Sequence, residues 1–95
     1  MKVIGREIIE QFGVSHGDSP GALQAWLNEA RVAEWRTPHD IKERYGSVSI
    51  IGGKNVVFDI KGRSYRMWTL VDYQRQIVMV KKIGTHREYD TWRIP

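Results

Sequence analysis

The period of the apolar residues changes near Gly46, and this change constrains the fold more than any other feature of the chain. Before Gly46 the apolar residues recur at helical spacing. The clearest stripe is Leu23, Trp26, Leu27 and Ala30. After Gly46 they alternate or form short β-branched runs, which are typical of strands. Helices followed by closely connected strands predict an α+β fold, with N-terminal helices on one face of a mostly antiparallel four- to five-stranded sheet.

A short strand at residues 1–4 and a helix at residues 6–12 open the predicted fold. The helix follows from apolar residues spaced three and four apart in that segment. Gly13 and Gly17 are expected to bracket the loop that follows, because glycine commonly interrupts helices.

Two further helices have recognisable start signals. Ser19–Pro20 combines a hydroxyl that can cap a helix with a proline suited to its first turn. Thr37–Pro38 repeats the signal, and Asp40 adds the acidic partner of a capping box. The second of these helices is predicted over residues 38–45, ending before Gly46. The stripe of the first one is interpreted as core packing, Trp26 included.

Four strands follow in the second half, at residues 47–50, 56–61, 64–71 and 76–83. Gly62–Arg63 is predicted to be a two-residue hairpin turn, which sets Asp59 opposite Arg66. A second two-residue turn is predicted at Gln74–Arg75. Short connections of this kind predict an antiparallel meander.

Alternation along these strands predicts one apolar and one polar sheet face. The apolar face, expected to meet the helices, contains Phe58, Ile60, Tyr65 and Met67. The polar face contains Lys61, Asp59, Arg66 and Trp68, and the second turn adds Lys81 opposite Trp68. Cations beside an aromatic ring suit RNA, because phosphates need positive charge and unstacked bases need aromatic surfaces. A solvated surface with a simple Asp59–Arg66 ion pair is the alternative.

Composition narrows the class of protein. The 95 residues predict one domain, residues 1–95, and the absence of cysteine excludes disulfides and zinc–thiolate sites. The start lacks a signal-peptide hydrophobic region and no apolar run approaches ~20 residues, so we expect a cytoplasmic protein without a membrane segment. Residues 46–95 have nine basic and four acidic residues, a net charge of +5. This excess favours an anionic partner, either nucleic acid or an acidic protein segment, over a basic surface kept for solubility.

The segment Gly84–Asp90 concentrates reactive side chains directly after an apolar run. His86 can transfer protons near neutral pH, and Tyr89 can stack on a base. His16 and His39 are interpreted as structural or exposed, and no pair of histidines has the spacing of metal ligands. No metal or other cofactor is expected.

Three segments together resemble the HigB branch of the RelE-like toxins, the toxin halves of bacterial type II toxin–antitoxin modules. They are Asp40–Ser49, Val56–Arg66 and Ile83–Asp90, and the resemblance extends from about Trp35 to Trp92. It implies the small RelE-like fold and endonucleolytic cleavage of mRNA, usually in the ribosomal A site. It also implies a HigA-type helix-turn-helix antitoxin as partner, with operator DNA bound indirectly through the antitoxin complex.

The resemblance also implies roles for individual residues. Arg66 occupies the place of the arginine that contacts the scissile phosphate. His86 occupies that of the acid or phosphate-stabilising group, and Tyr89 that of the stacking aromatic. The family's lysines before the hairpin are replaced here by Val57 and Asp59, a departure that leaves the general base unassigned.

Other residues are expected in secondary roles. Lys61 is expected to belong to the catalytic group. Either Lys61 or Arg63 is expected to compensate for the lysines that the family has before the hairpin. RNA contacts are expected from Arg63, Trp68, Lys81, Arg87 and Trp92. Asp59, Glu88 and Asp90 are supporting candidates. For Glu88 and Asp90, helix capping is preferred over orienting His86.

The implied reaction is transesterification, in which the ribose 2′-OH attacks the adjacent phosphorus and the 5′-oxygen leaves. Such a reaction needs no metal, because the nucleophile belongs to the substrate. Two other functions use the same basic face. One is RNA binding without catalysis, and the other is docking of an acidic protein partner.

Overall fold

The computed structural model describes residues Met1–Pro95 and contains four helices and a five-stranded sheet. Along the chain these are β1 (Lys2–Ile4), α1 (Arg6–Ser15), α2 (Pro20–Val32), α3 (Pro38–Arg44), β2 (Ser49–Ile51), β3 (Asn55–Ile60), β4 (Tyr65–Asp72), β5 (Ile77–Thr85) and α4 (His86–Tyr89). The strand order is β1-β5-β4-β3-β2, and every neighbouring pair is antiparallel except β1 and β5. The predicted α+β class, with a mostly antiparallel sheet, is confirmed.

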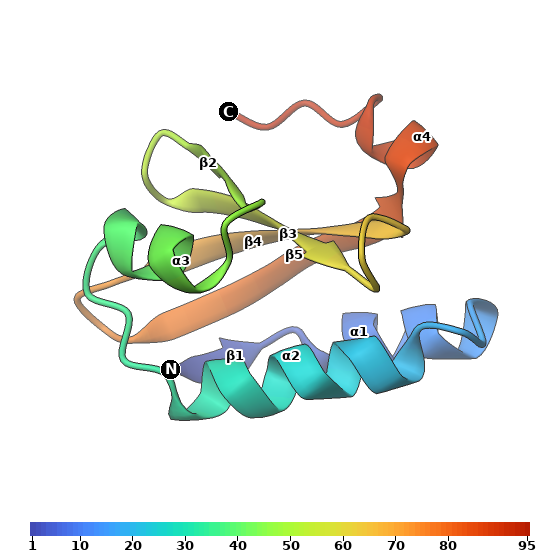
Figure 1. The fold of residues 1–95 in the computed structure, drawn as a ribbon, viewed down its shortest axis with the longest axis horizontal. Helices are drawn as coiled ribbons and strands as arrows, with labels where there is room; N and C mark the ends of the chain where they lie inside the picture. Colours follow the sequence, from blue (N-terminus) through green and yellow to red (C-terminus); the bar gives the residue numbers. More distant parts are fainter.

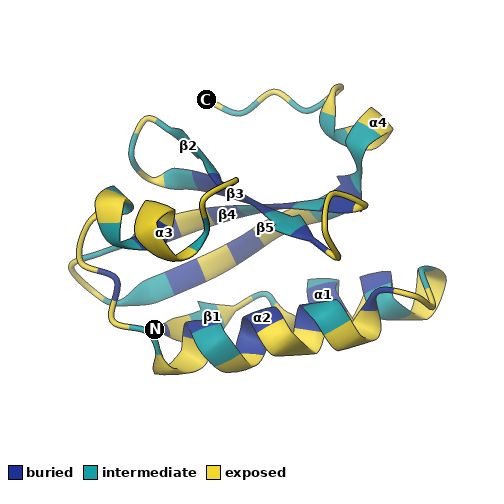
Figure 2. Cartoon of the chain, in the orientation of Figure 1, coloured by how far each residue is buried: buried dark blue, intermediate teal, exposed yellow.

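The sheet separates two unequal layers (Figure 1). Helices α1 and α2 lie along one face, whereas α4 and the C-terminal segment lie beyond the other. The core fills the space on the α1–α2 side. The predicted stripe of α2, Leu23, Trp26, Leu27 and Ala30, is entirely buried there (Figure 2).

Phe58 of β3 lies at the centre of an aromatic cluster in this core. Its ring centroid is 5.3 Å from that of Trp26, 5.9 Å from Trp35 and 5.1 Å from Tyr45. These rings come from α2, from the segment after it and from the end of α3. Because edge-to-face aromatic pairs add to the gain from apolar burial, the cluster links all three segments to the sheet.

Two predictions about the start of the fold are wrong. Helix α1 continues through Gly13 to Ser15, so this glycine does not begin a loop. A Cβ at Gly13 would lie 3.4 Å from Pro20 Cγ, so this glycine lies next to the first residue of α2. Ser19 does precede α2, but its buried hydroxyl donates to the carbonyl oxygen of His16 (2.7 Å) instead of capping the helix.

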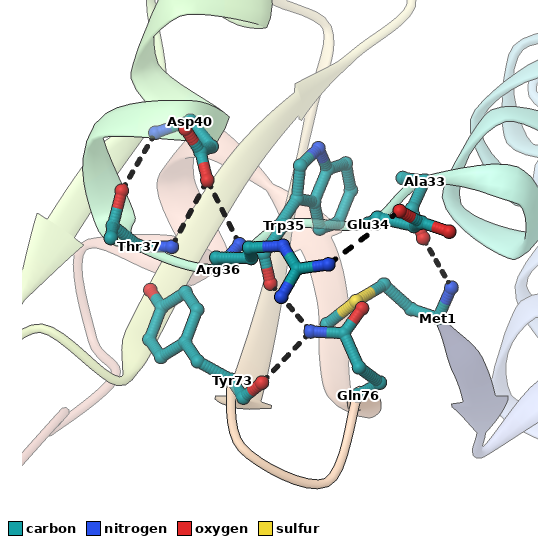
Figure 3. A network of polar contacts seen from close by, with 9 residues as sticks. All are labelled: Met1, Ala33, Glu34, Trp35, Arg36, Thr37, Asp40, Tyr73 and Gln76. Carbon is teal, nitrogen blue, oxygen red and sulfur yellow. Dashed lines mark hydrogen bonds and ion pairs between the residues drawn. The ribbon is translucent and has the colours of Figure 1, made fainter.

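The capping box of α3 is confirmed. Thr37 Oγ1 accepts the backbone N–H of Asp40 at 3.3 Å, and the Asp40 carboxylate accepts the backbone N–H of Thr37 at 3.2 Å. The same carboxylate also accepts the N–H of Arg36 at 2.9 Å. Figure 3 shows these bonds beside the side-chain amide of Gln76, which donates to the carbonyl of Trp35 and so links this segment to the β4–β5 turn.

Replacing Thr37 with alanine should lower the free energy of unfolding by about 1 kcal/mol, because the N–H of Asp40 loses its acceptor. Urea denaturation followed by tryptophan fluorescence measures this change. Thr37→Ser retains an acceptor oxygen and should recover most of the loss. An equal loss in both variants would show that packing of the threonine methyl group, not the cap, stabilises α3.

Candidate nucleic-acid interface

The β3–β4 hairpin has the predicted register. Asp59 pairs with Arg66 and Phe58 pairs with Met67. Phe58 and Met67 are fully buried against the helices, so Asp59 and Arg66 lie on the opposite face. We call this face, turned away from α1 and α2, the open face.

Arg66 is held between a carboxylate and an aromatic ring. Its Nε is 3.1 Å from Asp59 Oδ1, and its Cζ is 4.8 Å from the centroid of the Tyr89 ring. The two charged side chains are only 17% and 8% exposed. They form an ion pair without an aligned hydrogen bond, and the buried Nη1 of Arg66 has no hydrogen-bond partner. A buried guanidinium with unpaired N–H groups is costly, and an anionic ligand would remove that cost.

The residues of α4 approach Arg66 from above the open face. The helix begins at His86, with Thr85 as its cap, and contains Tyr89 one turn later. Residues three apart lie on the same side of a helix, so His86 faces the same way as the ring that covers Arg66. His86 Nε2 is buried and has no hydrogen-bond partner. Of the predicted site residues on α4, Tyr89 contacts Arg66, and His86 precedes it by one turn on the same side of the helix.

Gly84 does not end strand β5, as the sequence predicted, but lies within it. A Cβ at this position would be 2.8 Å from Trp92 Cζ2 and 3.1 Å from Glu88 Cβ. The glycine therefore provides the space in which α4 and Trp92 pack on the strand. The shape of the site depends on this close approach.

Glu88 is the capping acid that the sequence predicted. Its Oε1 accepts the backbone N–H of Thr85 at 2.9 Å, and Thr85 Oγ1 accepts the N–H of Glu88 at 3.2 Å. Asp90 has no such role, since it follows the end of α4, where its N–H donates to the carbonyl of His86. The preference for capping is confirmed for Glu88 and wrong for Asp90.

The cap of α4 should weaken in acid. The bond from the Thr85 N–H lowers the pKa of Glu88 below its ordinary value. A carboxylate whose pKa is lowered in the folded state stabilises the fold at pH values above its pKa in the unfolded state, which is about 4.3 for glutamate. This contribution disappears as the pH falls through the pKa of the folded state. The NMR shift of the Thr85 amide should therefore change below about pH 4. It should not change in Glu88→Gln, and a pH-independent shift in the wild type would contradict the cap.

Lys61 does not lie on the open face, contrary to the prediction. Its Nζ pairs with Asp18 Oδ2 at 2.8 Å, and the hydroxyl of Tyr65 donates to the other oxygen of the same carboxylate. Asp18 belongs to the connection between α1 and α2, on the helix side. Lys61 has a φ of 54°, which rotates its side chain out of the alternation of β3. The predicted turn at Gly62–Arg63 is confirmed, since the Ser64 N–H donates to the Lys61 carbonyl at 3.1 Å. The paired strands end one residue before Lys61 and begin one residue after Ser64.

A β-bulge changes the predicted pairing of Trp68. The register that the Gln74–Arg75 turn predicts for β4 and β5 is correct from Asp72 and Ile77 as far as Thr69 and Val80. Four residues separate the two strands. The register then shifts, so that Trp68 pairs with Lys82 and not with Lys81. Val80 and Ile83 both pack toward the core, so the two exposed lysines between them project from the open face.

Trp68, Lys82 and Trp92 extend the site beside Arg66. Trp68 Nε1 donates to Asn55 Oδ1 at 2.9 Å, which fixes its indole ring. Lys82 Nζ is 5.6 Å from the centroid of Trp92, whose ring meets that of Tyr89 edge to face at 5.5 Å. Lys82 was not among the site residues predicted from the sequence. Adjacent lysines between two inward-facing apolar residues break the alternation, and this break is the signal that indicates a bulge.

The remaining candidates lie around this cluster or away from it. Arg63 is exposed in the 61–64 turn, and Arg87 is exposed on α4. The predictions for the other histidines are confirmed. His16 stacks on Phe12 with ring centroids 3.9 Å apart, and His39 is an exposed partner of Glu43. No group of three or more histidine, aspartate or glutamate side chains is placed to hold a metal ion. None of the helices has the length and apolar character needed to cross a bilayer.

The comparison with known families gives the class of protein, the RelE-like toxic component of a toxin–antitoxin system. A family model described as HigB_toxin, RelE-like toxic component of a toxin-antitoxin system, matches residues 19–92. The chain belongs to the HigB toxin family, as the resemblance predicted. A search of individually curated proteins finds no match.

Proposed function

We propose that this toxin is an endoribonuclease that cleaves mRNA in the ribosomal A site and so stops translation. One observation supports the proposal above the others: a buried arginine with unpaired N–H groups lies beneath a tyrosine ring on a basic sheet face. Arginine binds phosphate through its planar fork, and aromatic rings stack on unpaired bases. Members of the HigB and RelE-like families generally act as endoribonucleases, which agrees with this chemistry.

In the proposed reaction the ribose 2′-OH attacks the adjacent phosphorus while the bond to the 5′-oxygen breaks. Arg66 binds the phosphate oxygens through its guanidinium group and stabilises the negative charge of the transition state. Asp59 keeps the guanidinium in place. The nucleophile comes from the substrate, so the chemistry assigned to these side chains involves no metal ion.

His86 is assigned proton transfer, either to the leaving 5′-oxygen or from the attacking hydroxyl. No protein group bonds to its Nε2, which is buried in the structure without substrate. Tyr89 is assigned stacking on a base next to the cleaved bond. Lys61 is left out of the catalytic group, because Asp18 neutralises it on the other side of the sheet.

The wider RNA contacts follow from the charge of the open face. Trp68 and Trp92 offer aromatic surface, while Lys81 and Lys82 offer phosphate contacts next to them. Arg63 and Arg87 are exposed and can contact more distant phosphates.

The proposal includes the cellular setting. Residues 1–95 act as one toxin domain in the bacterial cytoplasm, where translating ribosomes are found. A HigA-type helix-turn-helix antitoxin neutralises the toxin, and the complex reaches operator DNA through that antitoxin. The family implies an antitoxin partner, and the HigA type is part of this proposal.

Induction of the toxin in a bacterial host, followed by mapping of new 5′ ends, tests the proposal. One mRNA is compared in a translated copy and in a copy without a ribosome-binding site, and the Arg66→Ala toxin serves as the inactive control. We expect cuts only in the translated copy. Equal cutting of both copies would contradict ribosome dependence. Growth arrest without any new 5′ end would instead favour RNA binding or protein docking without catalysis.

A further inference from the structure

Three exposed apolar side chains form a continuous row across the open face. Met79 of β5 pairs with Ile4 on one side and with Leu70 on the other. Ile4 is 38% exposed, and Leu70 and Met79 are each 36% exposed. They are three of the five large apolar residues that the chain exposes, and the other two, Val14 and Val32, are on helices. Exposed apolar residues scattered singly are ordinary, whereas a contiguous row indicates a contact surface.

The row is separate from the Arg66 site. Leu70 is four residues further along β4, which corresponds to roughly 13 Å. The C-terminal segment that crosses the open face from α4 ends near the row, where Asn55 Nδ2 donates to the carbonyl of Pro95 at 3.4 Å. Asn55 is the partner of Leu70 on β3. Pro95 therefore lies beside the Leu70 end of the row.

A basic groove continues the row at the free edge of β1. It has a volume of about 300 Å³ and is lined by Met1, Lys2, Val3, Arg6 and Arg31. Strand β1 is the last strand of the sheet, so no further strand pairs with this edge. None of the three cations takes part in an ion pair. Alternation places Lys2 on the same face as Ile4, whereas Arg6 of α1 and Arg31 of α2 lie on the helix side. Lys2 therefore links the row to the groove, and a segment bound to both passes around the β1 edge.

We propose that this surface, the β1 groove with the Ile4–Met79–Leu70 row, is the docking site for an acidic, amphipathic segment of the antitoxin. Apolar side chains of that segment cover the row, and its carboxylates pair with Lys2, Arg6 and Arg31. The proposal rests on the antitoxin partner included in the proposed function. It adds where the partner binds and what chemistry its binding segment has.

Charge and composition favour this occupant over two others. A second copy of the chain would bring two basic grooves and two net charges of +4 together, which is unfavourable. RNA would satisfy the cations but not the row, which contains no aromatic ring on which a base can stack. An acidic amphipathic segment satisfies both parts of the surface.

The test measures binding to the purified product of the open reading frame beside the toxin gene. Titration calorimetry uses the toxin in an Arg66→Ala background, which can be produced without growth arrest. We expect Leu70→Glu and Arg31→Glu each to weaken binding at least tenfold, because each places a carboxylate against an acidic partner. Val14→Glu is the matched control, since Val14 is 87% exposed on α1 and outside the surface. It should bind like the parent.

Each other outcome has a defined meaning. If the parent binds and the variants bind equally well, the surface is wrong while the antitoxin partner stands. If the parent does not bind, the partner and the surface are both wrong. Leu70→Glu in the wild-type background should keep full RNA cleavage. If Leu70→Glu abolishes cleavage but leaves antitoxin binding unchanged, the row is an RNA contact. If the toxin is a dimer that Leu70→Glu separates, and antitoxin binding is again unchanged, the row is a contact between two copies of the chain. Either result overturns the proposal. Circular dichroism of every variant verifies folding.

Discussion

Replacing Arg66 with alanine should reduce mRNA cleavage by about 10²–10³-fold, the usual effect of removing a group that stabilises transition-state charge. Arg66 is the one cation that the structure places both on the open face and beneath the Tyr89 ring. The variant also leaves the Asp59 carboxylate without its partner near the substrate phosphate, which adds repulsion. Cleavage of a translated reporter mRNA, followed over time by primer extension, measures the loss.

The Arg66→Lys variant tests whether cleavage depends on the positive charge of Arg66 or on the planar shape of its guanidinium. Lysine keeps the positive charge but lacks the planar fork, so we expect it to recover only a small part of the activity. Arg36→Ala is the control, because this side chain is 79% exposed on the segment before α3 and far along the chain from the site. Full recovery with lysine would show that Arg66 acts only as a point charge. Unchanged cleavage in Arg66→Ala would refute the assigned site.

Replacing His86 with alanine should reduce cleavage by about 10²-fold or more, as expected for loss of a general acid or base. The variant should also lose one limb of the pH–rate profile between about pH 5 and 8, where histidine titrates. Single-turnover cleavage on stalled ribosomes at several pH values measures both effects. A change in rate without a change in the profile would indicate that His86 contacts phosphate and does not transfer the proton.

His39→Ala is the matched control for this experiment. His39 is a histidine near a helix N-terminus like His86, but it is exposed and pairs with Glu43. It should cleave at the wild-type rate with the wild-type pH profile. A loss of similar size in both variants would indicate a general effect on folding, and thermal denaturation of the two proteins distinguishes that case.

Local patterns predicted a large part of the fold correctly. The Thr37 capping box and the α2 core stripe depend on contacts within a few residues, so their signals are complete in the sequence. The five strands were located with ends that differ by one or two residues. The pairing of Asp59 with Arg66 was also predictable, because a short hairpin fixes the register of its two strands.

The errors arose where a distant residue overrides a local rule. Lys61 leaves the strand alternation to pair with Asp18, which is 43 residues earlier in the chain. Gly84 remains within a strand because Trp92 occupies the space of its missing side chain. Lys82 replaces Lys81 opposite Trp68 because of a bulge between two otherwise regular ladders.

The sequence by itself determined the first three helices, the strands, the basic second half and the identity of Arg66, His86 and Tyr89 as the residues to consider, whereas α4 was not predicted. These depend on period, charge and short motifs, which act over one or two turns of chain. Only the tertiary structure decided which cations reach the open face. That outcome depends on a φ value at Lys61, a bulge at the end of β5 and the packing of α4 on Gly84. The conformation of Lys61 accompanies a contact with Asp18, 43 residues earlier in the chain. The bulge and the packing at Gly84 join neighbouring elements, β4 with β5 and β5 with the segment of α4 and Trp92. All three depend on how the elements pack together, which no local sequence pattern records.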